Sequence, residues 1–120
     1  MSQASVKSSG GRPFLHVVTV TPAGTSQSTA ASIPNSSPGV ILAAGNSWNG
    51  VVLPTAGRGK TFWVKNTGTT ELGGLRVFPA SGDSINALAA DAYLEMEENT
   101  SAMFVAISST VWYTFPALPS

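Results

Sequence analysis

The chain has 120 residues, no cysteine and only 10% charged residues, which balance to a formal net charge of zero. This length predicts a single domain with its own hydrophobic core. The absence of cysteine excludes disulfides and thiolate metal sites. Nucleic-acid binding is not expected without a basic cluster, and a membrane partner is not expected because no apolar run is long enough to span a bilayer.

The low charge content is unusual, because ordinary soluble proteins carry about 25% charged residues. Interface cores are depleted of Lys, Glu and Asp, so this composition is typical of a surface that packs against other subunits. The N-terminal residues contain no apolar segment of the kind found in a secretory signal. We therefore expect a protein that is made and assembled in a cytoplasm.

The N-terminal third is mostly polar. Residues 1–12 are small and polar and end in Gly10-Gly11, which predicts a flexible arm, or one laid over a neighbour, ahead of a single domain at residues 13–120. Residues 14–20 are rich in β-branched side chains and predict a strand that Pro22 ends. Residues 23–38 predict a long loop, of a kind that is usually functional or lies on a partner.

From Gly39 onward, short apolar runs alternate with turns. Runs at 40–42 and 51–53 are followed by strand patterns at 61–66, 75–78, 85–88 and 93–96, and by a closing hairpin formed by 102–107 and 111–115. The helix formers between residues 86 and 98 leave a helical turn near 89–92 as an alternative. The turns recur at intervals of about ten residues, which is typical of antiparallel sheets. We predict an all-β fold, either an antiparallel β-sandwich or a small jelly-roll-like barrel.

Gly59-Lys60-Thr61 resembles the end of a phosphate-binding loop. That motif requires a glycine where this chain has Pro54, and proline has no N–H to offer a phosphate. The residues after Lys60 also predict a strand rather than the helix that the motif needs. The interpretation that we favour is a turn leading into a strand, with no bound nucleotide or other cofactor.

No set of residues predicts catalysis. His16 is the single histidine, and it lies mid-strand without other metal ligands at a suitable spacing, so a structural role is favoured. Asp83 occurs in a turn sequence, where aspartate usually binds backbone N–H groups. The serines lack the glycine pattern of a nucleophile elbow. The sequence therefore predicts no catalytic, cofactor-binding or metal-binding residues.

Three tryptophans are the candidate interface residues. Alternation places Trp63 opposite Phe62 and Val64. It also places Trp112 opposite a second apolar set, Val111, Tyr113 and Phe115. If those apolar sets fill the core, both tryptophans point outward and mark an interface, with Trp48 as a third candidate. The alternative that stays open is a second core layer, or cover by the N-terminal loop.

Residues 50–116 resemble a module of tailed-bacteriophage virion proteins. The resemblance rests on "NGVVLPTAGRGKTFWVKNTG", "LRVFPASGDSIN" and "SAMFVAISSTVWYTF". In that module an apolar strand ends in Leu-Pro, a glycine turn enters an aromatic strand, a Pro-Ala-x-Gly turn follows, and a hairpin with Trp-Tyr closes it. The module occurs in head decoration proteins and in tail-fibre or spike segments.

The resemblance implies a β-rich, commonly trimeric structural module without enzymatic activity. The expectation is a homotrimeric capsid decoration protein on the virion surface, which binds the major capsid protein and stabilises the shell. The first alternative is a tail-fibre or spike module that binds a host receptor or glycan. A small hydrolase is a further alternative, which the absence of a nucleophile–base set disfavours.

Overall fold

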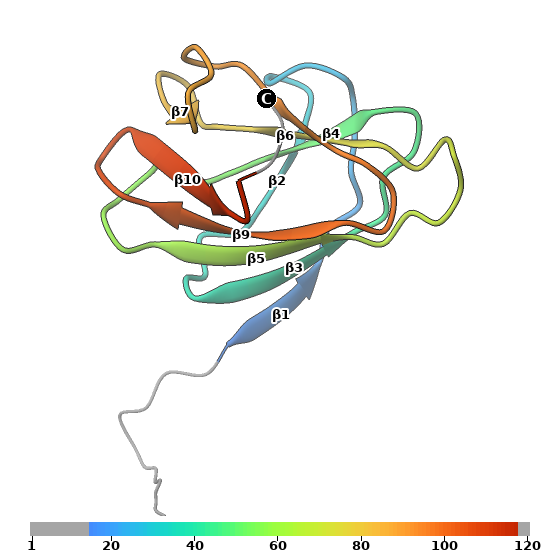
Figure 1. The fold of residues 1–120 in the computed structure, drawn as a ribbon, viewed down its shortest axis with the longest axis horizontal. Helices are drawn as coiled ribbons and strands as arrows, with labels where there is room; N and C mark the ends of the chain where they lie inside the picture. Colours follow the sequence, from blue (N-terminus) through green and yellow to red (C-terminus); the bar gives the residue numbers. More distant parts are fainter. Residues whose placement is uncertain (1–14, 118–120) are drawn as a thin grey trace, which may run out of the picture.

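A computed structural model describes residues 15–117, and within them the chain forms ten strands and no helix (Figure 1). The six strands of sheet A are, in spatial order, β1 (His16–Thr19), β3 (Gly39–Ala43), β5 (Thr61–Asn66), β9 (Ser101–Ala106), β10 (Val111–Phe115) and β7 (Ser84–Ile85). The four strands of sheet B are β2 (Ala31–Ser32), β4 (Asn49–Val52), β6 (Leu75–Phe78) and β8 (Leu94–Met96). The prediction of an all-β fold is confirmed.

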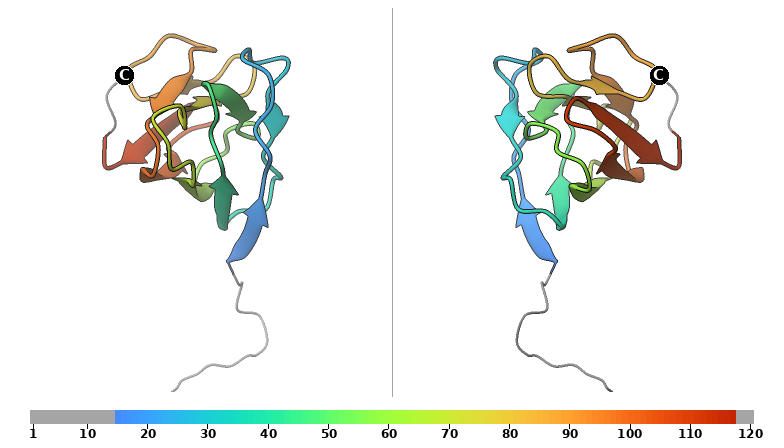
Figure 2. Two further views of the ribbon diagram at one scale, coloured as in Figure 1. Left: turned by 90° about the vertical axis from the view of Figure 1, so that its right-hand side faces the viewer. Right: turned by 90° about the vertical axis from the view of Figure 1, so that its left-hand side faces the viewer.

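The two sheets form two layers with the core between them, and β1 lies at one margin of sheet A (Figures 1 and 2). Alternation along the strands fills this core, as in β5, where Phe62, Val64 and Asn66 are buried. The largest fully buried side chains of sheet A are Trp112, Phe62 and Phe104. Sheet B contributes Val51, Leu75, Val77, Leu94 and Met96 from the opposite side. Both sheets therefore supply one apolar face to a shared core.

The prediction of an antiparallel sandwich or barrel is wrong, because both sheets are mixed. β1, β3 and β5 run parallel in sheet A, and β2, β4 and β6 run parallel in sheet B. From β1 to β6, each strand is followed by one in the other sheet, and the chain returns to each sheet in its original direction. This is the winding of a β-solenoid. Turns at regular spacing do not reveal whether the next strand pairs with the previous one or crosses to the other layer.

The parallel strands of sheet A have a regular period. Val17, Val40 and Trp63 lie side by side at equal intervals along the chain. Each of the first three strands of sheet B is followed closely by a proline, at Pro34, Pro54 and Pro79. Proline ends a strand because it cannot donate to the ladder. The sequence contains this repeated pattern of an apolar residue followed by proline, but turn spacing alone does not show that it marks the ends of strands in one sheet.

The C-terminal strands close the solenoid. β9 pairs antiparallel with both β5 and β10, and β8 pairs antiparallel with β6. The predicted hairpin across Ser108-Ser109-Thr110 is confirmed as β9–β10. The segment 23–38, predicted as a loop, contains the short strand β2. Residues 1–12, predicted as a flexible arm, lie outside the described residues.

Candidate interaction surface

The outer face of sheet A carries a continuous apolar row. The strand registers place five side chains beside one another across five strands, in the order Val17, Val40, Trp63, Met103 and Phe115. Their neighbours within β3, β5, β9 and β10 are buried, and Val18 beside Val17 packs against the core, so this row points away from it. An antiparallel or mixed sheet with one solvated face usually has polar residues there. An apolar row on the outside is therefore unusual for a solvated face.

Further apolar side chains flank the row. Val105 lies between Thr61 and Tyr113, and Leu42 lies beside Lys65. Lys65 is the one charged residue at the outward positions of β1, β3, β5, β9 and β10, and its Nζ donates to the carbonyl oxygen and Oδ1 of Asn99 at one end of the sheet. We define the sheet-A face as the outward apolar residues Val17, Val40, Leu42, Trp63, Met103, Val105, Val111, Tyr113 and Phe115.

The sheet-A face is substantially exposed. Trp63, Tyr113 and Phe115 are 41%, 44% and 51% exposed, and Val17 is 66% exposed. An aromatic side chain has about 150–250 Å² of surface, so each of the three leaves about 60–130 Å² to solvent. With its aliphatic neighbours the face reaches the range of about 300–600 Å² in which the largest patch on a soluble protein is often functional.

Of the predicted interface tryptophans, only Trp63 lies on this face. Trp112 is fully buried, with its ring centroid 5.9 Å from that of Phe62. The predicted orientation of residues 111–115 is therefore wrong, since Tyr113 and Phe115 are exposed and Trp112 lies in the core. Counting apolar residues failed because this strand has apolar residues on both faces.

A polar partner makes the observed orientation of β10 possible. Thr114 is buried beside Trp112, but its hydroxyl accepts from Nδ2 of Asn86 at 2.9 Å and its N–H donates to Oδ1 of Asn86 at 3.0 Å. A buried threonine whose polar groups are paired costs little. Tyr113, in turn, keeps its hydroxyl at the surface. Nothing in the local sequence pattern shows that Asn86 performs this role.

Trp48 lies in a tight turn at the start of β4, beyond the outer side of sheet B. Its backbone adopts a positive φ of 61°, and its N–H donates to the carbonyl of Gly74 at 3.1 Å. A Cβ at Gly74 would lie 2.6 Å from Cδ2 and Cε3 of Trp48, so the indole packs directly on this glycine. Trp48 is half-buried, and its accessible surface is smaller than that of Trp63.

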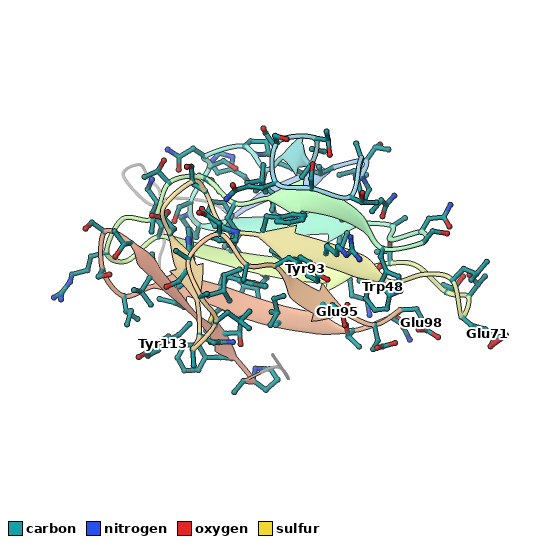
Figure 3. The ribbon with its side chains drawn as sticks, turned by 90° about the horizontal axis from the view of Figure 1, so that it is seen from above. Trp48, Glu71, Tyr93, Glu95, Glu98 and Tyr113 are labelled. Carbon is teal, nitrogen blue, oxygen red and sulfur yellow. The ribbon has the colours of Figure 1, made fainter. Side chains whose placement is uncertain are left out.

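Other aromatic contacts cover the outer side of sheet B. The Arg76 guanidinium lies 4.5 Å from the ring centroid of Tyr93, and its Nη1 donates to the Thr25 carbonyl at 3.1 Å. Tyr93 also contacts Phe78 edge-on, with 5.4 Å between ring centroids. Figure 3 shows Tyr93, Trp48 and Glu95 near one another and Tyr113 apart from them. This side therefore differs from the sheet-A face in having both charged and aromatic groups.

Hydrogen bonds hold three further polar side chains, those of Asp83, Lys60 and Asp91. Oδ2 of the buried Asp83 accepts the N–H of Ala56, which lies in another loop, at 2.9 Å. The predicted bond from this aspartate to a backbone N–H therefore joins two loops and does not close its own turn. Lys60 directly precedes β5, and its Nζ donates to the Thr55 carbonyl at 2.8 Å. The N–H groups of Gly82 and the Gln27 side chain hold the pKa of Asp91 below its usual value.

Within residues 15–117, no three His, Cys, Asp or Glu side chains are grouped so that they could bind a metal ion. The same residues form no helix that is long and apolar enough to cross a membrane. Known protein-family models do not match the chain, and the search of curated proteins finds no relative.

Proposed function

We propose that this protein is a non-enzymatic virion structural protein, a capsid decoration protein that binds the outer surface of a phage head as a homotrimer. The observation that carries this proposal is the sheet-A face, which is broad, apolar and nearly free of charge. The resemblance of residues 50–116 to phage virion modules gives the partner, the major capsid protein. The proposed location is the capsid surface, after assembly in the host cytoplasm.

The mechanism is binding alone. Removing apolar surface from water contributes about 25 cal/mol per Å², and the costs of association and of ordering side chains offset part of this gain. A patch of a few hundred Å² is small beside the about 800 Å² per partner of a standard interface. A trimer presents several such patches at once, and linking them raises the effective affinity although no single contact becomes stronger. For this reason we propose an oligomer.

The test adds purified protein to particles that lack it and measures occupancy over a concentration series. The variant Trp63→Lys places a charge at the centre of the sheet-A face, and we expect a large loss of occupancy. The matched control is Leu72→Lys, because Leu72 is 67% exposed but lies in the β5–β6 loop, outside this face. Occupancy of Trp63→Lys equal to wild type would contradict the proposal.

Light scattering tests the oligomer separately. A homotrimer gives about three times the 12.3 kDa chain mass. A monomer at every concentration would refute a preformed trimer, whereas the occupancy experiment would still decide whether the sheet-A face binds the shell.

The second candidate is a tail-fibre or spike module that binds a host glycan. The observation that favours it is the outer side of sheet B, where Trp48 and Tyr93 present aromatic rings near Glu95 (Figure 3). Sugars stack on such rings and hydrogen bond to carboxylates. The copy number in purified particles separates the two candidates, since hundreds of copies indicate a head protein and a handful indicate a tail protein.

A further inference from the structure

The strand β1 forms a free edge of sheet A. It pairs with β3 on one side, and no strand of the described chain lies on its other side. Its residues are almost all exposed, and Val17 is 66% and the adjacent Leu15 51% exposed. Figure 2 shows this edge at the margin of the molecule, away from the loops that cover sheet B. Within the described residues, the edge is thus accessible along its whole length.

The hydrogen bonds show which backbone groups face outward. The N–H of His16 donates to the Pro38 carbonyl at 3.3 Å, and that of Val20 donates to the Leu42 carbonyl at 2.9 Å. In a parallel ladder, alternate residues face the same neighbour, so His16, Val18 and Val20 face β3. The N–H and C=O groups of Leu15, Val17 and Thr19 therefore face the free side.

This edge lacks the features that usually protect an exposed strand. Native proteins cover or twist such edges, or place lysine, proline or a bulge in them. Residues 15–20 contain no lysine or proline, and the register of β1 with β3 runs without a bulge. The segment carries no acidic or permanently basic side chain, so two copies can approach each other without like-charge repulsion.

We propose that β1 pairs antiparallel with β1 of a second copy of this chain, around a twofold axis at Val17. With the axis at Val17, Leu15 lies opposite Thr19 of the second copy, so all three outward-facing residues take part in the ladder. An axis at His16 or Val18 leaves one of the three without a partner in this segment. The edge is self-complementary, which is what a twofold contact requires.

The pairing also extends the sheet-A face. Directly opposite residues in a ladder point to the same side of the sheet, so the two Val17 side chains lie beside each other. The row of Val17, Val40, Trp63, Met103 and Phe115 then continues into the same row of the second copy. The contact thereby doubles the width of the apolar surface, which argues for a second copy as the occupant of this edge.

This inference goes beyond the proposed function and does not depend on it. A twofold contact through β1 is compatible with a threefold contact elsewhere on the molecule, and on a particle it links neighbouring trimers. Edge pairing adds few hydrogen bonds, each with a net value of about 0.5–1.5 kcal/mol. We therefore expect a weak contact in dilute solution that high local concentration strengthens.

The cysteine-free sequence makes the register directly testable. In the proposed ladder the two Val17 Cα atoms are about 5.5 Å apart, within the range of about 4.4–6.8 Å that a disulfide spans. At high protein concentration with diamide as oxidant, Val17→Cys should form a disulfide-linked dimer at least tenfold faster than Leu15→Cys or Thr19→Cys alone. An equimolar mixture of Leu15→Cys and Thr19→Cys should form the mixed dimer preferentially.

Ser109→Cys, at the exposed β9–β10 turn, gives the rate of random collision. A Val17→Cys rate equal to that control, or a maximum at another position of residues 15–19, would overturn the proposal.

A second variant tests the backbone bonds. Val17→Pro removes only an outward-facing N–H, a position that an edge strand tolerates, so cross-linking of the Leu15→Cys and Thr19→Cys pair should fall at least tenfold while the melting temperature stays near that of wild type. Undiminished cross-linking in that background would also contradict strand pairing.

Discussion

The buried Asn66 side chain binds the backbone of Gly45 across the fold, with Oδ1 accepting the Gly45 N–H at 2.9 Å. Oδ1 also accepts the N–H of Gly68 at 3.0 Å. Nδ2 donates to the carbonyls of Gly73 at 2.7 Å, Met96 at 3.1 Å and Glu97 at 3.0 Å. One side chain therefore fixes the three turns that follow β3, β5 and β8 at the same end of the core.

We predict that Asn66→Ala destabilises the protein by about 3–5 kcal/mol, because it leaves several buried backbone groups without partners. Urea unfolding followed by fluorescence measures the loss. Asn35→Ala is the control, since Asn35 is exposed and has no side-chain hydrogen bond within the described residues, and we expect a change below about 0.5 kcal/mol. Equal effects of the two substitutions would show that Asn66 does not hold the turns together.

The orientation of β10 gives a second prediction. Trp112→Ala should cost about 3–5 kcal/mol, because it removes a fully buried ring that contacts Phe62. Tyr113→Thr, the adjacent residue on the exposed face, should change stability by less than about 1 kcal/mol because threonine also favours strands. Unfolding should be measured at a protein concentration where light scattering shows monomer. A larger loss for Tyr113→Thr would reverse the assignment of the two faces.

These two sites show how far the sequence leads. Alternation correctly predicts the strand at 61–66, with Phe62 inward and Trp63 outward, because one face of that strand is distinctly more apolar. It fails for Trp112, because sheet A is apolar on both sides and pattern alone cannot choose between them. The parallel winding was missed since turn spacing does not record which layer a strand joins. The role of Asn66 depends on turns far apart in the sequence, which no local pattern reveals.

Close packing at Gly74 gives the third prediction. A methyl group there would lie 2.6 Å from the Trp48 ring, so Gly74→Ala should cost about 1–3 kcal/mol through overpacking. In a Trp48→Ala background the same substitution should cost less than about 1 kcal/mol, because the clash is gone. The difference is a coupling energy, which a double-mutant cycle measures.

Gly82→Ala is the control for that cycle. Gly82 has a positive φ of 87° and no atom within 4 Å of a Cβ at this position, so the cost of its substitution is backbone strain. Trp48→Ala should leave that cost unchanged. A Gly74→Ala cost that persists in full without Trp48 would mean that the glycine is required for some reason other than the indole.

The final prediction concerns acid stability and Asp91. Its carboxylate accepts the Gly82 N–H at 2.7 Å and Nε2 of Gln27 at 3.1 Å, which together lower its pKa below the usual 3.8. A folded-state pKa below the unfolded one stabilises the fold above the unfolded value, and this contribution is lost as the pH falls through the folded value. Asp91→Asn should therefore lower the urea midpoint at pH 7, and the difference from wild type should shrink below about pH 4.

Asparagine suits the positive φ of 69° at this position, so the backbone is not the cause of any loss. A difference between Asp91→Asn and wild type that stays constant from pH 7 to pH 3 would show that the charge of Asp91 does not contribute to stability.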